Sequence, residues 1–305
     1  MNQNKAWLIY FLLIPWFIGA APSPAQQSDD SQRILEVKKK AETGNAKAQY
    51  SLGFMYAGGQ GTPKDHPEAM KWFRKAAEQG DAKAEFALGA GYMDGRGVSK
   101  DEAEAMKWIR KAADQGHPVA QYSLGDIYRR GQGVPKNSSE AVKWYRKAAE
   151  QGYADAQYQL AICYANGFGV PNDEAEAMKW YGKAAAQGIA DAQINLGNIY
   201  IAGRGVPKDA SEAAKWWRKA AEQGEAEIQF NLGTICYLGM GVPKDEAEAY
   251  KWFLLAAAQG VERAKKSLMA MERDSTPEKR EQGKRMASEF KSVKSIDQSL
   301  QYLRP

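Results

Sequence analysis

The sequence contains few of the residues that build metal centres and disulfide frameworks. Among 305 residues there are two histidines and two cysteines. Such small numbers leave little material for a ligand cluster or for a set of crosslinks. We therefore expect no metal, no cofactor and no disulfide, and we find no combination of residues that indicates an enzyme.

Charge of one sign is also scarce. Lysine and arginine total 42 against 37 aspartates and glutamates, which gives a net charge of +5. Proteins that bind nucleic acid usually concentrate basic residues on one face. The near balance gives no reason to expect a nucleic-acid partner.

Long hydrophobic runs are absent except at the beginning of the chain. Lys5 precedes an apolar run from Ala6 to Ala21, and small residues follow it. The run is shorter than the roughly 20 residues that span a bilayer, and it has the form of a secretory signal. We expect cleavage after Ala25, a periplasmic or secreted protein, and no integral membrane span afterwards. An uncleaved anchor remains the alternative.

The sequence does contain a repeat of fixed length. Tryptophan recurs every 36 residues in six copies, at Trp72, Trp108, Trp144, Trp180, Trp216 and Trp252. A strict period of this size is typical of stacked supersecondary units that lean on their neighbours. We therefore predict an array of repeats in place of one globular core.

Each repeat reads as two helices, as the fifth copy illustrates. Ala192, Leu196 and Tyr200 are spaced by four residues and form one apolar face of a first helix. Gly197 allows a neighbouring helix to come close. Gly203 and Gly205 permit a tight reversal before Pro207, which breaks helix at the preceding residue.

The second helix has its own start and stop signals. Asp209, with Glu212 three residues later, predicts a capping box, and the same pair of positions recurs in all six copies. Ala213, Trp216 and Ala220 form a buried stripe, and Gly224 is a typical end residue. We expect the tryptophans to be core residues.

The predicted organisation is as follows: a signal peptide at 1–25; a linker at 26–30 and a capping half-repeat helix to residue 44; repeats at 45–80, 81–116, 117–152, 153–188, 189–224 and 225–260; a half-repeat and a capping helix at 261–291; and a flexible tail at 292–305. Ser275, Pro277 and Glu278 predict the start of the capping helix, with Met286 and Phe290 covering the last repeat. Cys163 and Cys236 lie two repeats apart, too far for a bridge, and are expected to be buried thiols.

The pattern resembles the Sel-one-like repeat family, a relative of the tetratricopeptide repeats. Fifteen positions of the fifth repeat match the family pattern, from Ala192 through Trp216 to Gly224. Ala161, Ile228 and Cys236 depart from it without breaking the helices. The resemblance implies an all-α, right-handed α/α superhelical solenoid of about 6.5 repeats, with the first helices on the inner curve. It also implies an adaptor or scaffold role, often in the bacterial envelope.

A helical projection places a set of side chains on the open side of the first helices. As candidate partner-binding residues on the concave face we select Tyr50, Phe86, Tyr122, Asp126, Arg129, Tyr158, Asn198 and Tyr237. Aromatic and arginine side chains are enriched at binding surfaces. For the aromatic residues at the position of Tyr50, packing between units is the alternative; Asp126, Arg129, Asn198 and Tyr237 break the repeat's own pattern.

Other motifs have plainer explanations. Lys71 and Arg74 alternate with glutamates, as on an ordinary solvated helix. The Gly-x-Gly turns follow helices and not strands, so they do not indicate nucleotide binding. Ser288 and Lys291 spell the Ser-x-x-Lys motif of penicillin-recognising enzymes, but the accompanying elements are missing.

We therefore expect a monomeric, non-catalytic scaffold that binds an unknown protein or peptide along the first helices. A cell-wall or β-lactam-binding or hydrolysing member of the same family is the alternative. Self-assembly through the ends of the array is a third possibility, which the polar ends of the array argue against.

Overall fold

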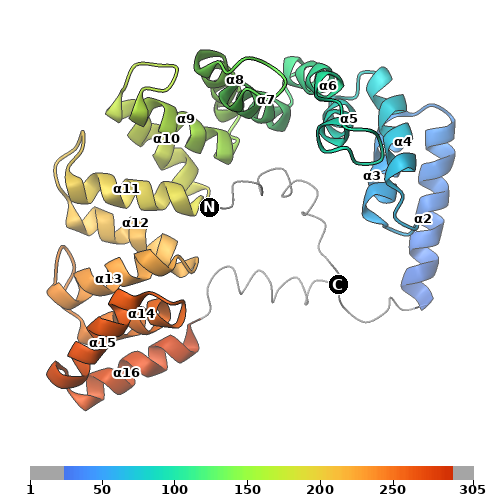
Figure 1. Cartoon of the computed structure of the whole chain (residues 1–305). Coiled ribbons are helices and arrows are strands. Elements are labelled where there is room, and N and C mark those ends of the chain that lie inside the picture. Colours follow the sequence, from blue (N-terminus) through green and yellow to red (C-terminus); the bar gives the residue numbers. More distant parts are fainter. Residues whose placement is uncertain (1–23, 291–305) are drawn as a thin grey trace. The chain divides into compact units, whose positions relative to one another are not determined.

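The computed structural model describes residues 24–290, which form fifteen α-helices and no strand (Figure 1). The all-α prediction is confirmed. The chain divides into an N-terminal unit that ends at Ala156 and a C-terminal unit that begins at Gln157. The predicted signal run and the tail from residue 292 lie outside the described residues.

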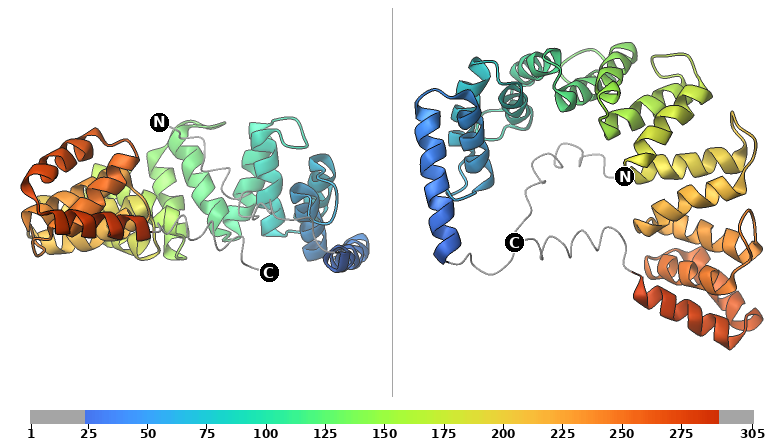
Figure 2. Two further views of the ribbon diagram at one scale, coloured as in Figure 1. Left: turned by 90° about the horizontal axis from the view of Figure 1, so that it is seen from below. Right: turned by 180° about the vertical axis from the view of Figure 1, so that it is seen from behind.

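The N-terminal unit begins with α2 (Pro24–Glu42), so residues 26–30 are helical and the linker predicted there is wrong. Three helix pairs follow, and successive helices pack side by side (Figure 2). They are α3 (Ala46–Gly58) with α4 (His66–Glu78), α5 (Ala82–Asp94) with α6 (Glu102–Asp114), and α7 (Pro118–Arg130) with α8 (Ser138–Glu150).

The boundary between the units falls within α9 (Ala154–Asn166). The C-terminal unit continues with α10 (Glu174–Ala186), α11 (Ala190–Ala202), α12 (Ala210–Glu222), α13 (Ala226–Leu238) and α14 (Glu246–Ala258). It ends with α15 (Glu262–Asp274) and α16 (Pro277–Glu289).

The predicted caps of the second helices are present. In all six copies the side chain of the aspartate or asparagine accepts a hydrogen bond from the backbone N–H of the glutamate three residues on, as Asp209 does from Glu212. The reciprocal half of the predicted capping box is not formed, because the N–H of each cap residue donates to the preceding first helix, as Asp209 does to the Tyr200 carbonyl at 3.0 Å. Three of the glutamates bond forward along the helix instead. Glu104, Glu176 and Glu248 accept from the indole N–H of the tryptophan four residues later, at 3.0–3.2 Å. In these three repeats the glutamate therefore orients the tryptophan.

Glycine is required at the turns and where helices approach closely. Gly224 has φ +94°, in the left-handed region that favours glycine. Gly197 lies against the second helix of its own repeat, where an added Cβ would be 2.3 Å from the ring of Trp217. Gly97 lies against the backbone of His66 at the start of the preceding second helix, 2.4 Å from such a Cβ. Glycines thus set the spacing both within and between repeats.

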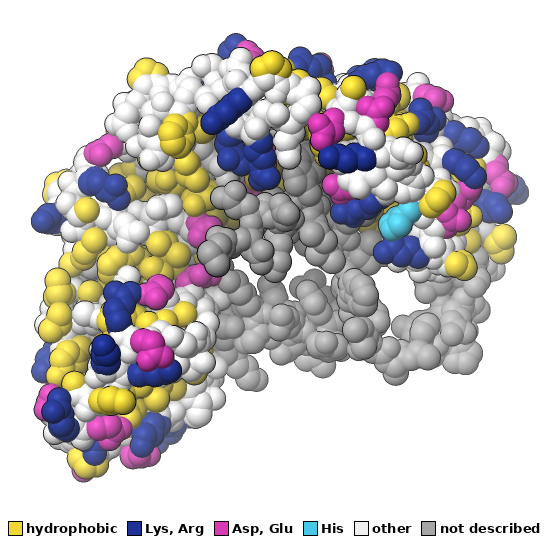
Figure 3. Space-filling view, in the orientation of Figure 1, with side chains coloured by type: hydrophobic (Ala, Val, Ile, Leu, Met, Phe, Trp, Pro, Cys, Tyr) yellow, Lys and Arg dark blue, Asp and Glu magenta, His cyan; other side chains and the backbone are white. Residues whose placement is uncertain are grey.

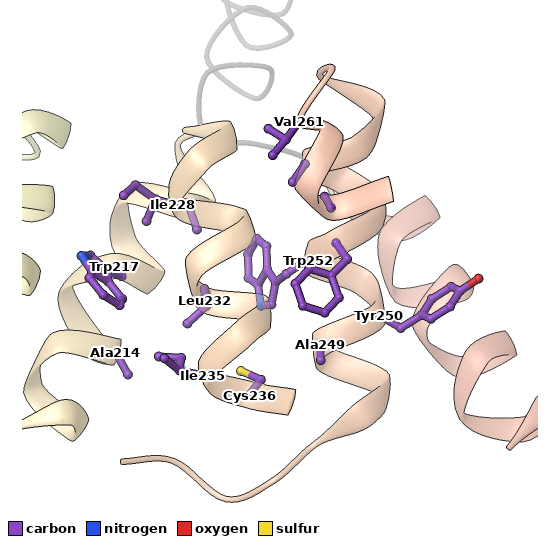
Figure 4. Packing of buried hydrophobic residues seen from close by; sticks show 14 of the residues in the cluster. Ala214, Trp217, Ile228, Leu232, Ile235, Cys236, Ala249, Tyr250, Trp252 and Val261 are labelled. Atoms are coloured by element: carbon purple, nitrogen blue, oxygen red, sulfur yellow. The ribbon is translucent and has the colours of Figure 1, made fainter. Parts of the chain in front are cut away.

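The core of the C-terminal unit is a cluster of apolar side chains from α12 to α15. Leu232, Ile235 and Trp252 are fully or almost fully buried in it (Figure 4). Phe290 closes the cluster, with its ring 5.4 Å from that of Trp252. The prediction that Phe290 covers the last repeat is confirmed, and Met286 is half-buried.

Two details of the core differ from expectation. Five of the six repeat tryptophans are buried, but Trp216 is half-exposed. Trp217 is buried beneath Gly197, at the position that Phe73 and Phe253 occupy beneath Gly53 and Gly233. The N-cap of α16 is Thr276 and not Ser275, because Ser275 ends α15. Cys163 and Cys236 are buried and not disulfide-bonded, as predicted.

Candidate functional site

The predicted partner-binding residues lie on the first helices, and their aromatic side chains differ in how deeply they are buried. Tyr50, Tyr122, Tyr158 and Phe230 are half-buried, and each packs against a ring of the second helix in its own repeat, with centroids 5.6–5.9 Å apart. One part of each side chain therefore supports the repeat, and the remainder reaches the surface. Burial and the nearby Asp126 raise the pKa of Tyr122, so its phenol stays neutral.

Phe86 is the exception in this aromatic series. It is 8% exposed, and its ring stacks on that of His117 in the next repeat, with centroids 5.5 Å apart. Its side chain is part of the interior of the N-terminal unit. The predicted direct contact of Phe86 with a partner is not compatible with this burial.

Asp126 is also an interior residue. It is 2% exposed, forms ion pairs with Arg129 at 2.6 Å and Arg130 at 2.8 Å, and accepts a hydrogen bond from the Tyr145 hydroxyl at 3.0 Å. A buried carboxylate needs such partners, because burial without them costs several kcal/mol, on the order of the desolvation penalty of an ion. Asp126 therefore cannot offer its carboxylate to a partner, which corrects the sequence-based prediction.

Arg129 remains available at the surface. Its side chain is 41% exposed even though it pairs with Asp126. Burial lowers the pKa of Arg129, but the pairing with Asp126 outweighs this and raises it overall, so its charge is permanent. Asp126 and the Tyr145 hydroxyl thus hold the Arg129 guanidinium in place.

Asn198 and Tyr237 are half-exposed on α11 and α13 of the C-terminal unit. Asn198 occupies the repeat position of Asp126, yet none of the described residues bonds its amide. The ring of Tyr237 lies beneath the Lys244 ammonium, 5.4 Å from the centroid. Both side chains are partly accessible, and their contact with a partner stays a prediction.

A series of buried glutamines was not identified as a network from the sequence. Gln49, Gln121, Gln193 and Gln229 each donate to a backbone carbonyl at the end of the preceding second helix, at 3.0–3.1 Å. Each also accepts from the glutamine that follows the second helix of its own repeat, at 2.7–2.9 Å. The sequence contains a signal for this network, because a polar residue recurs every 36 residues at a core position.

Glu85 replaces glutamine in this series. It is buried and accepts from Gln115 at 2.7 Å, but a carboxylate cannot donate to the preceding helix. Burial raises the pKa of Glu85, opposed by the nearby Lys111 and by the bond from Gln115. The second repeat therefore has a weaker polar contact with the first than its counterparts do.

The N-terminal unit has a cavity of about 540 Å³ at the amino ends of α3, α5 and α7. It is lined by Lys47, Tyr50, Ser51, Asp81, Lys83 and His117, among others. Asp81 caps α5 by accepting from the Ala84 N–H at 2.9 Å, and His117 caps α7 through Nδ1, which accepts from the Ala120 N–H at 3.2 Å. The cavity joins three successive first helices.

The C-terminal unit has a cavity of about 750 Å³ between α12 and the turn at residues 241–243. Ala214 lines it, whereas the first, second and fourth repeats have methionine at that position. The half-exposed Trp216 forms part of the wall. The charged lining residues Lys215 and Arg218 already form ion pairs with Glu212 and Glu248.

The other candidate motifs of the sequence form no recognisable site among the described residues. No group of histidine, cysteine, aspartate or glutamate side chains among residues 24–290 could hold a metal ion. The Ser288 hydroxyl donates to the Arg285 carbonyl on α16, and Lys291 lies outside the described residues. Within the described part of the chain, no helix is both long enough and apolar enough to cross a bilayer.

Comparison with known proteins identifies the repeats. The Sel1 repeat pattern matches six consecutive segments, at 46–81, 82–117, 118–153, 154–189, 190–225 and 226–261. The chain belongs to the Sel1 repeat family. Sel1 repeat proteins are generally non-catalytic scaffolds, which suggests protein–protein interaction for this chain too.

Two solved structures resemble this chain in fold and sequence. One is c5321, described as a protective antigen of uropathogenic Escherichia coli with an SLR fold, at a TM-score of 0.72 and 36% identity; the match covers 83% of this chain and 55% of c5321. The other is a Sel1 repeat protein from Oxalobacter formigenes, at a TM-score of 0.61 and 35% identity over 75% of this chain and 96% of that protein.

Two curated relatives match over short segments. The chitin synthase regulator SKT5 of Malassezia restricta is 39% identical over 64 residues, and the secretory immunoglobulin A-binding protein EsiB of Escherichia coli is 51% identical over 41 residues. These segments are 21% and 13% of this chain but only 4% and 8% of the two relatives.

Proposed function

We propose that this protein is an exported, non-catalytic scaffold that binds a protein or peptide through its first helices. The contact residues are the exposed parts of Tyr50, Tyr122 and Arg129 in the N-terminal unit and of Tyr158, Asn198 and Tyr237 in the C-terminal unit. We call this set the first-helix face. It combines aromatic rings, an arginine and an amide, side chains that occur often in binding surfaces.

The observation that carries the proposal is the contrast with the second helices. Their lysines pair with glutamates three residues earlier, at 2.6–3.0 Å for Lys71, Lys107, Lys143 and Lys179. A further lysine lies over each of the first five repeat tryptophans, 3.9–4.5 Å from the ring centroid. The lysines of the second helices thus have partners within their own repeats, whereas the amide of Asn198 on a first helix bonds none of the described residues.

The relatives support a binding role. The names of these two relatives describe a chitin synthase regulator and an immunoglobulin A-binding protein, and neither name describes a reaction. Export rests on the sequence of residues 1–25. Mass determination of the protein recovered from its native host should show an N-terminus at Gln26, and an intact Met1 would contradict export by cleavage.

The test is affinity capture with the mature chain followed by measurement on the purified partner. Asn198→Ala with Tyr237→Ala should weaken binding about tenfold or more, as expected when central contacts are truncated. The matched control is Lys179→Ala with Lys215→Ala on the second helices, which should leave binding unchanged.

Thermal melts of both variants establish that they fold. Binding that survives the first pair of substitutions, or that is lost with the control pair, would exclude the first-helix face. Hydrolysis of a chromogenic β-lactam by the purified chain, abolished by Ser288→Ala, would instead support the enzymatic alternative.

A further inference from the structure

The cavity of the N-terminal unit has an excess of positive charge with no assigned partner. Lys47 and Lys83 line it, are exposed, and form no ion pair with any of the described residues. The acidic lining residue Asp81 caps α5 and keeps its negative charge, so two lysines face one aspartate and an excess of positive charge is left. A group of opposite charge that enters this cavity would therefore meet two free ammonium groups.

His117 adds a directed donor to these charges. Its Nδ1 accepts from the Ala120 N–H, so the neutral ring carries its proton on Nε2, which has no partner among the described residues. Burial and the nearby Lys83 lower the pKa of His117, while Asp81 opposes them, so the neutral form predominates near pH 7. Stacking on Phe86 fixes the plane of the ring. An N–H donor beside two ammonium groups suits a carboxylate.

The same positions in the C-terminal unit have the opposite charge. Lys47 and Lys83 are the third residues of the first and second repeats, and the fifth and sixth repeats have Asp191 and Glu227 there. Glu227 forms an ion pair with Arg263. The reversal within one repeat frame shows that the frame itself does not require lysine. The basic pair is therefore specific to the N-terminal unit.

We propose that this cavity binds the acidic side chains of an extended peptide segment. The inference rests on the proposed function and adds the chemical class of the partner. Lys47 and Lys83 line one cavity from two first helices, and three residues of extended chain span about 10 Å. Carboxylates three residues apart in the segment can thus reach Lys47 and Lys83, with the His117 Nε2–H donating to one of them.

The test uses the full mature chain and a blocked, fluorescently labelled peptide, acetyl-(Glu-Ser-Ser)₄-amide, with the glutamine version as the neutral reference. The acidic peptide should bind and the glutamine peptide should not. Lys47→Gln with Lys83→Gln should weaken binding about tenfold, as expected when complementary charges are removed. Lys64→Gln with Lys136→Gln removes the same charge from exposed turns and should change the affinity less than about twofold.

The two histidines supply a local readout. Nitrogen-15 spectra of the imidazoles should show a shift at His117 Nε2 on addition of the acidic peptide, with His66 as the internal reference. Equal losses in both lysine pairs, or equal shifts at both histidines, would show attraction to net charge only and would overturn the proposal. Binding that requires an unblocked peptide C-terminus, or that inorganic phosphate reproduces, would also overturn it.

Failure here is distinguishable from failure of the proposed function. If Asn198→Ala with Tyr237→Ala weakens capture of the native partner while the acidic peptide does not bind, the scaffold role stands and the acidic specificity is wrong. If the acidic peptide binds as predicted but no first-helix substitution affects the native partner, the cavity is an acidic-peptide site, and the wider proposal of a first-helix face fails.

Discussion

The two units join their repeats by different means within the same 36-residue frame. In the N-terminal unit, Arg74 and Arg110 of the second helices bond the hydroxyls of Tyr92 and Tyr128 in the following repeats. The C-terminal unit has Gly182 and Leu254 at two of the equivalent positions. At the third, Arg218 bonds Glu248 of the following repeat, where Cys236 replaces the tyrosine. The apolar cluster around Trp252 packs the last helices of this unit together.

The first helices show the same contrast at their amino ends. Asn45, Asp81 and His117 cap their helices through the side chain, whereas Ile189, Glu225 and Val261 form no such bond. In the space-filling view, hydrophobic side chains gather over the α11–α13 part of the C-terminal unit (Figure 3). The comparison teaches that the repeat determines the backbone. The contacts between repeats and the surface side chains differ between the two units.

The largest expected effect tests the apolar cluster around Trp252. Trp252 is 1% exposed, so Trp252→Ala should lower the free energy of unfolding of the C-terminal unit by about 3–5 kcal/mol. Trp216→Ala, at the half-exposed equivalent, should cost about 1–2 kcal/mol because less area is buried. Urea unfolding monitored by circular dichroism measures both. Equal losses would mean that the two tryptophans pack alike.

The next effect tests the polar cluster around Asp126, which lies within the third repeat. Asp126→Ala removes the shared partner of Arg129, Arg130 and Tyr145 and should cost about 3 kcal/mol. Asn198→Ala, at the same repeat position in the C-terminal unit, should cost less than about 0.5 kcal/mol because its amide bonds no described residue. The same unfolding measurement applies. A cost below about 1 kcal/mol for Asp126→Ala would show that the buried ion pairs add nothing.

A third effect depends on pH, and the substitution is expected to raise the free energy of unfolding, whereas the first two lower it. Because the folded-state pKa of Glu85 is raised, its ionisation penalises the fold. The penalty is absent below the unfolded pKa, develops as pH rises through the interval up to the raised pKa, and is complete above it. Glu85→Gln should therefore stabilise the N-terminal unit by about 1 kcal/mol at pH 7 and have little effect near pH 3.

The matched change for this prediction lies in the C-terminal unit. Gln193→Glu should impose the corresponding penalty at pH 7 and relieve it in acid. Unfolding curves at pH 7 and near pH 3 measure whether the effect of each substitution depends on pH. A gain from Glu85→Gln that is the same at both would show that ionisation of Glu85 is not the cause.

The smallest effect comes from replacing an arginine–tyrosine contact of the N-terminal unit by the residue that the C-terminal unit has there. Arg110→Leu introduces the residue that the sixth repeat has at this position, Leu254, and removes the contact with Tyr128. We expect a loss of about 0.5–1 kcal/mol, the range for an exposed cation–π contact. The thermal midpoint of the N-terminal unit reports it. No change at all would mean that the arginine is dispensable to the joint.

The sequence predicts the fold well because each repeat carries its own start and stop signals. Asp209 caps a helix and Gly224 ends one through local backbone chemistry alone, so no knowledge of the neighbours is needed. The linker at residues 26–30 was wrong because polar composition does not exclude a helix. Trp216 was misassigned because it lines the cavity beside Ala214, where three other repeats have the larger methionine.

The candidate site was predicted less completely because its chemistry depends on contacts between helices. A projection of one helix cannot show that Tyr145, on the next helix, buries Asp126, or that His117 in the next repeat stacks on Phe86. The cavity is hidden for the same reason, since three helices supply its lining. Glu85 could have been noticed, because the other five repeats have glutamine at that position.

The most direct test of the first-helix face is photo-crosslinking in the native envelope. A crosslinkable residue at Asn198 on α11 is compared with one at Lys179 on the second helix α10, an exposed position in the same unit. The account predicts a discrete protein adduct from position 198 and none from position 179. An adduct from position 179 alone, or equal adducts from both positions, would contradict it.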